Sequence, residues 1–222
     1  MASKKKSIWV FGDYRNYYQN RVTLQLISKA MDLAKSINAE VCALVFGHEI
    51  DEWIMEYTAH GADRILAIDD PALKSYSTEQ YLAIMENLAR ERDPEIILIG
   101  ATDFGREFAP RLAKRLKTGL SADCVGLEIT AEGLLVQIAP SFGGNMLAEI
   151  VTENHRPQMA TVLARVRREL VERAVPQHRD GGPIHGEVAD AGHVPAGRPE
   201  LARARAVVAH RSLGVPGRAP GA

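Results

Sequence analysis

The residues EIILIGATDFGREFAPRLAKRLK, numbered 95–117, hold the pattern that decides the fold. Residues 95–100 form an apolar run rich in Ile and Leu, which is typical of a strand buried on both faces of a sheet. Asp103 then stands where a helix cap is expected, and the residues after it predict a helix through Lys117. A fully buried strand followed directly by a helix is the repeating unit of a parallel α/β sheet.

The same alternation extends toward the N-terminus. Apolar runs predict further buried strands at residues 7–12, 40–47 and 64–68. Apolar residues at helical spacing and Pro-containing stops predict helices at residues 22–37, at 48–60, and from a cap at Ser77 or Thr78 to Arg92. Uniformly apolar strands that alternate with helices indicate a mostly parallel, doubly wound α/β sheet.

The pattern changes after Thr118, where short β-type segments replace the strand–helix alternation. These segments are residues 124–130, 134–140, 145–152 and 158–162. The glycines at 133 and 143–144 are suited to the turns between them. We therefore expect an antiparallel β extension to follow the doubly wound half.

Composition changes sharply after Val162. All lysines and aromatic residues lie within residues 1–162, whereas Ala, Arg, Gly and Pro make up more than half of residues 163–222. A stretch without aromatic residues buries too little apolar surface to offset the entropy of ordering its backbone. We therefore expect one folded domain, residues 1–162, and a disordered, low-complexity tail, residues 163–222, that is not a folded domain.

Three interpretations of this tail remain open. It could be a natural flexible extension, or an Arg-rich arm that binds nucleic acid, although interspersed acidic residues dilute its charge. It could also be an out-of-frame translation of GC-rich DNA, since codons for Ala, Arg, Gly and Pro can consist of G and C alone. The composition favours the third interpretation.

Charge and cysteine content exclude several classes of protein. The 222 residues carry a formal net charge of −1, which argues against a nucleic-acid-binding protein. No apolar run is long enough to predict insertion into a membrane. Only Cys42 and Cys124 carry thiols, and they are far apart, so we expect a cytoplasmic protein without disulfides or a cysteine zinc site.

Residue chemistry alone predicts no catalyst and no metal site. Ligands of open α/β sheets bind at the carboxyl ends of the strands, here Gly12-Asp13, Gly47-His48, Asp69-Asp70 and residues 100–103. These ends lack the glycine-rich signatures that hold phosphate groups. The histidines show no metal-binding spacing, and the folded part offers no plausible Ser-His-Asp set.

Three stretches together carry a family resemblance. They are IWVFG at 8–12, the run from LIGAT at 98–102 through GREFAPRLA at 105–113 to LKTGLSADC at 116–124, and PSFGGN at 140–145 with ATV at 160–162. Residues 7–162 thus resemble the N-terminal domain of the electron transfer flavoprotein alpha subunit. The turn at Gly143-Gly144-Asn145 is similar to that of the branch of this family that includes electron-bifurcating members.

The resemblance implies a heterodimer with the electron transfer flavoprotein beta subunit. In the complete complex, a C-terminal domain of the alpha subunit binds FAD, and the beta subunit holds AMP or a second FAD. The complex accepts electrons from acyl-CoA or related dehydrogenases, as in fatty acid β-oxidation. The N-terminal domain is a scaffold for the beta subunit and not an enzyme on its own.

The resemblance also suggests positions for two kinds of contact. Candidates near the nucleotide of the beta subunit are Thr118, Gly119, Ser121 and Asp123. Candidates for the subunit interface are Gly100, Thr102, Asp103, Phe142, Gly143 and Asn145. Taken without the resemblance, the same positions would be a loop, the end of a helix and a hairpin turn.

The chain departs from the family after Val162, where a short linker and then the FAD domain would follow. The tail begins at this junction and lacks the expected flavin motifs. We therefore expect a truncated alpha subunit whose FAD domain is missing or frameshifted, and which binds no cofactor alone. The alternative is a stand-alone nucleotide-binding or interaction module of the universal-stress or adenine-nucleotide α-hydrolase type, which shares the doubly wound topology.

Overall fold

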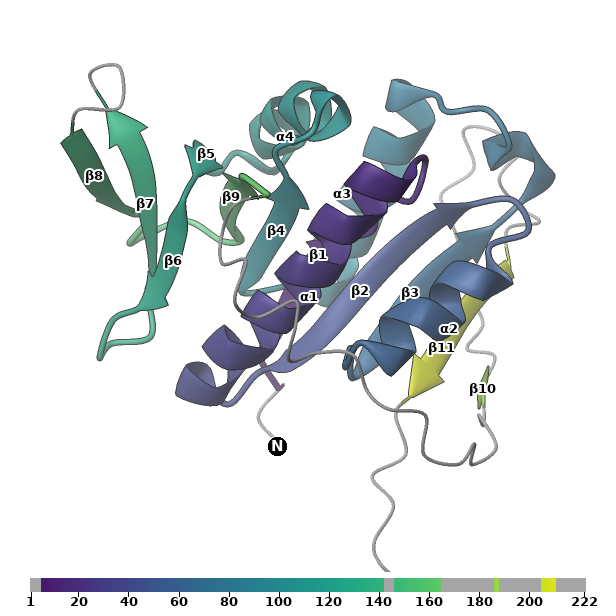
Figure 1. Cartoon of the computed structure of the whole chain (residues 1–222), viewed down its shortest axis with the longest axis horizontal. Coiled ribbons are helices and arrows are strands. Elements are labelled where there is room, and N and C mark those ends of the chain that lie inside the picture. Colours follow the sequence, from purple (N-terminus) through teal and green to yellow (C-terminus); the bar gives the residue numbers. More distant parts are fainter. Residues whose placement is uncertain (1–4, 142–145, 165–185, 188–204, 211–222) are drawn as a thin grey trace, which may run out of the picture.

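The fold is a mostly parallel sheet covered by helices, with a small antiparallel sheet beside it (Figure 1). A computed structural model describes residues 5–141, 146–164, 186–187 and 205–210. Six strands of the main sheet run parallel in the order β3-β2-β1-β4-β9-β5. They are β1 (Ser7–Phe11), β2 (Glu40–Gly47), β3 (Arg64–Asp69), β4 (Ile96–Gly100), β5 (Leu120–Cys124) and β9 (Gln158–Val162).

Helices cover both faces of this sheet because the central strands are apolar on both sides. In β1, Ile8 and Val10 join one buried cluster, while Trp9 and Phe11 join the other, as the two-residue period of a strand requires. The first cluster packs under α1 (Tyr17–Ile37) and α2 (Asp51–Ala59). The second packs under α3 (Thr78–Arg92) and α4 (Asp103–Leu116). A short 3₁₀ helix, Pro71–Leu73, precedes α3.

The antiparallel sheet consists of β6 (Gly126–Ile129), β7 (Leu135–Ser141) and β8 (Met146–Val151), in that order. Its inner face packs on the main core through Leu127, Leu135 and Ala139. Strand β8 is the outer strand of this sheet in the described part of the chain.

The doubly wound, mostly parallel α/β class with an antiparallel extension is confirmed, but one strand was misassigned. Gln158–Val162 does not continue the antiparallel segment; it pairs in parallel with β4 and is buried along its whole length. Leu120–Cys124, which the sequence did not predict as a strand, pairs with it as β5. The chain therefore leaves the main sheet after β5, forms the small sheet and returns.

Two helix starts also differ from the sequence prediction. Helix α1 begins at Tyr17 and not at Val22, because the Asn16 side chain accepts a hydrogen bond from the Gln19 N–H and caps the helix. Helix α4 is capped by Thr102 and not by Asp103. The Thr102 hydroxyl oxygen accepts the Gly105 N–H at 3.2 Å, and Asp103 is the first helical residue.

Two short strands lie in the stretch that was predicted to be a disordered tail. Strand β11 (Arg205–His210) runs antiparallel along β3, and β10 (Gly186–Glu187) pairs with β11. The sequence predicted neither. Beyond these strands and residues 163–164, the prediction for residues 163–222 falls outside the described residues and stays a prediction.

Close contact between α4 and β4 requires glycine at position 105. A Cβ atom there would lie 1.8 Å from the carbonyl oxygen of Gly100, which is backbone and cannot rotate away. We expect Gly105→Ala to lower the free energy of unfolding by about 2 kcal/mol or more, because the helix must shift off the strand. Urea denaturation measures this, with exposed Lys114→Ala on the same helix as the control. Equal stability of the two variants would contradict the packing.

Burial of both thiols gives a second check on the core. Desolvation raises the pKa of Cys42 to about 12 and that of Cys124 to about 11, so little thiolate forms at pH 8. We expect an aromatic disulfide reagent to label the native protein at pH 8 far more slowly than the urea-unfolded protein. Immediate labelling of one thiol in the native chain would show that its side of the core is open.

Candidate functional site

The point where ligands bind in doubly wound sheets lies between β1 and β4. These strands are neighbours, but the helices that follow them, α1 and α4, cover opposite faces of the sheet. Such a switch in direction leaves a crevice outside the carboxyl ends of the two strands. Asp13 follows β1 and Thr102 follows β4 at this place.

In this chain, its own side chains fill the crevice. The carboxylate of Asp13, only 5% exposed, accepts hydrogen bonds from the Thr102 hydroxyl at 3.1 Å and from Arg15 Nε at 2.8 Å. The backbone N–H of Asp13 donates to the Thr23 hydroxyl oxygen at 3.0 Å. Buried charges need such partners, so Asp13 is committed to joining β1, α1 and the start of α4.

Arg15 closes the crevice from outside. Its guanidinium carbon lies 3.9 Å from the centre of the Phe104 ring and 4.8 Å from that of Tyr76. The guanidinium therefore lies over two aromatic faces while its Nε pairs with Asp13. Both the cation–π contacts and the ion pair stabilise this position of Arg15. Arg15 thereby links the loop after β1 to the first turn of α4 and to the segment before α3.

The crevice does not fit the phosphate groups of a flavin or adenine nucleotide. A phosphate there would meet the negative charge of Asp13, which repels it. Two N–H groups in the first turn of α4 are also engaged, since those of Gly105 and Arg106 donate to the side-chain and backbone oxygens of Thr102.

The four residues suggested near the partner's nucleotide do not form one cluster. Thr118 and Gly119 precede β5 at the amino edge of the sheet, whereas Asp123 lies near its carboxyl end, and Ser121 is buried between them. At that far end, the Asp123 carboxylate accepts a hydrogen bond from Arg106 Nε at 3.1 Å. The run TGLSADC therefore supplies Thr118 and Gly119 to one edge and Asp123 to the other, and does not form a single binding site.

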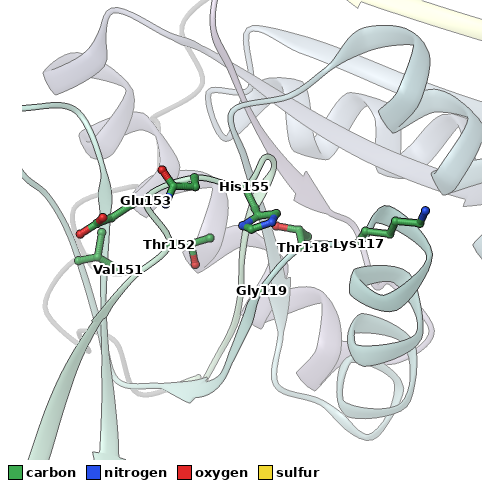
Figure 2. A pocket seen from close by; sticks show the side chains of 8 residues that line it. Lys117, Thr118, Gly119, Val151, Thr152, Glu153 and His155 are labelled. Carbon is green, nitrogen blue, oxygen red and sulfur yellow. The ribbon is translucent and has the colours of Figure 1, made fainter.

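Thr118 and Gly119 instead form one wall of a groove of about 490 Å³ (Figure 2). Its lining comes from the end of α4, the start of β5, and the loop from β8 to β9. The residues are Lys117, Thr118, Gly119, Val151, Thr152, Glu153, Asn154 and His155.

Hydrogen bonds hold both walls of the groove in place. The Thr118 hydroxyl donates to the carbonyl oxygen of Pro157 at 2.8 Å. Arg156 donates from one guanidinium nitrogen to the carbonyl oxygens of Thr152, Glu153 and His155, and its Nε pairs with Glu95. Arg156 therefore fixes the loop that forms the second wall.

The residues suggested for the subunit interface fall into three groups. Gly100 and Thr102 are buried at the switch point, so they shape the surface from below and do not form it. Asp103 is exposed at the start of α4. Phe142, Gly143 and Asn145 lie outside the described residues.

Strand β8 carries an exposed apolar surface that the sequence prediction missed. The β8 surface consists of Met146, Leu147, Ile150 and Val151, which are 60%, 63%, 40% and 37% exposed. The sequence of β8 held a usable signal, because its apolar residues do not alternate with polar ones and so lie on both faces of the strand. A strand of a sheet that packs on the core with only one face would leave those on its other face exposed. Met146 and Ile150 lie on one face of the strand and Leu147 and Val151 on the other. Exposed apolar residues on an edge strand favour pairing with another chain.

Neither a metal site nor a membrane span is found in the part of the chain that the structure describes. No group of three or more His, Cys, Asp or Glu side chains in residues 5–141, 146–164, 186–187 and 205–210 could hold a metal ion. Among the same residues, no helix is both long enough and apolar enough to cross a membrane.

Comparison with known proteins gives relatives that include electron transfer subunits. The chain is 43% identical to the electron transfer flavoprotein subunit alpha of Clostridium acetobutylicum over 158 residues, which are 71% of this chain and 47% of the relative. It is 44% identical over 161 residues to the lactate dehydrogenase (NAD(+),ferredoxin) subunit LctC of Acetobacterium woodii, and these residues are 72% of this chain and 38% of the relative. It is 35% identical over 180 residues to the acryloyl-CoA reductase electron transfer subunit beta of Anaerotignum propionicum, and the match covers 71% of this chain and 49% of the relative.

The chain spans about half the length or less of these curated relatives. The family model for the electron transfer flavoprotein domain matches residues 8–187, which include the six parallel strands of the main sheet except Ser7 and extend beyond Val162. The chain therefore belongs to the electron transfer flavoprotein domain family, and its sequence is similar to that of the alpha subunits.

Proposed function

We propose that the chain is an alpha-type electron transfer flavoprotein subunit whose α/β domain is the scaffold for a beta-type subunit. The complex would carry electrons from acyl-CoA or related dehydrogenases to an acceptor. Family membership and the names of the relatives, several of them electron transfer subunits, support this function. The two free thiols, Cys42 and Cys124, are in keeping with the reducing cytoplasm as its location.

The β8 surface is the observation that carries this proposal. Its four apolar side chains lie on an outer strand, where backbone groups on one side have no neighbouring strand among the described residues. Covering this surface would remove apolar area from water, and pairing with the strand edge would satisfy its backbone groups. A beta-type subunit is the occupant that family membership favours.

FAD belongs, in this proposal, to the half of the relatives that the chain does not match, and AMP or a second FAD belongs to the beta-type subunit. The filled switch point supports this division, because Asp13 and Arg15 occupy the position where a nucleotide would otherwise enter. We therefore propose that this chain alone binds no flavin. When bound in the complete complex, FAD supplies the electron-carrying chemistry; this domain's own contribution is to hold the partner in place.

The same geometry makes a stand-alone nucleotide-binding module the weaker alternative. Such a module needs free N–H groups and an uncharged surface beside the carboxyl ends of its strands. Here Thr102 accepts the N–H groups of Gly105 and Arg106, and its hydroxyl donates to a buried carboxylate.

The docking proposal predicts that Leu147→Asp prevents assembly with the beta-type subunit of the same organism. A charge on the β8 surface would have to be desolvated without a partner, which costs a factor of at least about 100 in affinity. Co-expression with a tagged beta-type subunit, followed by calorimetry or pull-down, measures the loss. Met55→Asp is the matched control, because Met55 is equally apolar and 54% exposed but lies on α2. Unchanged assembly of Leu147→Asp would refute docking at β8.

The cofactor proposal predicts that the purified 222-residue chain is colourless. Its visible spectrum, recorded with and without added FAD and after gel filtration, should show no flavin absorbance that stays with the protein. A yellow protein with one flavin per chain would overturn the assignment of FAD to the unmatched half of the relatives. Arg15→Ala serves as a probe in the same assay, since it removes the guanidinium that covers the crevice.

A further inference from the structure

We propose that the groove between residues 117–119 and 151–155 is a second part of the docking site. It receives the end of an extended segment of the partner that lies along β8, and it binds a carboxylate on that segment. This inference rests on the proposed function and adds to it the position and chemistry of a separate recognition site.

Continuity with β8 is the first argument. Val151 is the last residue of β8, belongs to the β8 surface and also lines the groove. A strand that adds to the outer side of β8 and runs past Val151 therefore enters the groove without a turn. Strand addition of this kind gains affinity from backbone hydrogen bonds and specificity from pockets for individual side chains.

The arrangement of charge along the groove is the second argument. Figure 2 shows Val151 and Glu153 on one side, Thr152 in the middle, and Thr118, His155 and Lys117 on the other side. A segment arriving from β8 passes Glu153 first and then reaches Thr118 and His155, beyond which the exposed Lys117 side chain points outward. An acidic group at the end of the segment is thus placed away from the Glu153 carboxylate, on the side of the groove that carries His155 and Lys117.

The loop from β8 to β9 is prepared to donate hydrogen bonds. Arg156 already occupies the carbonyl oxygens of Thr152, Glu153 and His155. What remains on this wall to meet a ligand includes the Thr152 hydroxyl, the Asn154 amide and the His155 ring. The donors among these groups can bind an oxygen-rich group such as a carboxylate.

Glycine at position 119 keeps the groove open. A Cβ atom on Gly119 would lie 3.2 Å from the Thr152 hydroxyl oxygen, so a side chain here would project toward the opposite wall. Gly119 is exposed, and its backbone is not in the left-handed region, so a larger residue fills the groove once the Thr152 side chain moves aside. Position 119 therefore offers a direct way to block the site.

The test measures the affinity of the full chain for the beta-type subunit of its own organism. We expect Gly119→Phe to weaken binding about tenfold or more by filling the groove, and Lys117→Glu to weaken it about three- to tenfold by reversing the charge. Lys114→Glu is the matched control, because Lys114 is exposed on the last turn of α4 but does not line the groove, and it should change affinity less than about twofold.

Leu147→Asp in the same assay separates this inference from the proposed function. If Leu147→Asp prevents binding while Gly119→Phe and Lys117→Glu bind like the unmodified chain, the partner docks on β8 but the groove is not used, and the inference is wrong. If Leu147→Asp also binds normally, the proposed function fails and the inference falls with it.

Amide hydrogen exchange tests the site without any substitution. We expect residues 118–119 and 152–155 to exchange more slowly when the partner is added, together with β8. Protection of β8 alone would overturn the inference. A partner shortened at its C-terminus then identifies the source of the carboxylate. If the partner's terminal carboxylate binds in the groove, Lys117→Glu no longer weakens binding of the shortened partner. If an internal Asp or Glu binds there, Lys117→Glu still weakens it.

Discussion

Strand β1 has to bury apolar side chains on both of its faces, and the rest of the molecule is arranged around this constraint. Its neighbours β2 and β4 have the same requirement, so helices must cover both sides of the sheet. The chain meets the requirement by sending α1 and α4 to opposite faces. The crevice produced by that switch is where Asp13, Arg15 and Thr102 meet. The buried carboxylate thus joins the two halves of the winding at the point where related topologies bind ligands.

Much of the parallel sheet could be predicted from the sequence because its strands are short, apolar and followed by helices. Residues 40–47 and 96–100 illustrate this, since their apolar composition predicts burial on both faces and both strands are buried in the sheet. Gln158–Val162 was predicted as a strand but given the wrong neighbours, because a single strand does not record which sheet it joins. The cap at Thr102 was displaced by one residue, since Thr and Asp are both good caps and only the geometry of the Gly105 N–H decides between them.

The candidate site was less predictable, for physical reasons that individual residues make clear. Family resemblance grouped Thr118 with Asp123, but a strand of five residues holds its two ends at opposite edges of the sheet. The β8 surface was visible in the sequence only as apolar residues, and exposure is a property of the neighbours that a strand lacks. The groove depends on Arg156 and Thr118, whose hydrogen bonds to Glu95 and Pro157 join segments far apart in the sequence.

The exposed outer strand also has a consequence for the life of the chain in a cell. A newly made copy presents apolar side chains and unpaired backbone together, which is the combination that templates pairing between identical chains. In the proposed complex, a copy whose β8 is not yet covered would be a substrate for chaperones and proteases. Its steady-state abundance would therefore follow the supply of the partner and not only its own rate of synthesis. Docking at β8 would thus make matched production of the two chains a requirement.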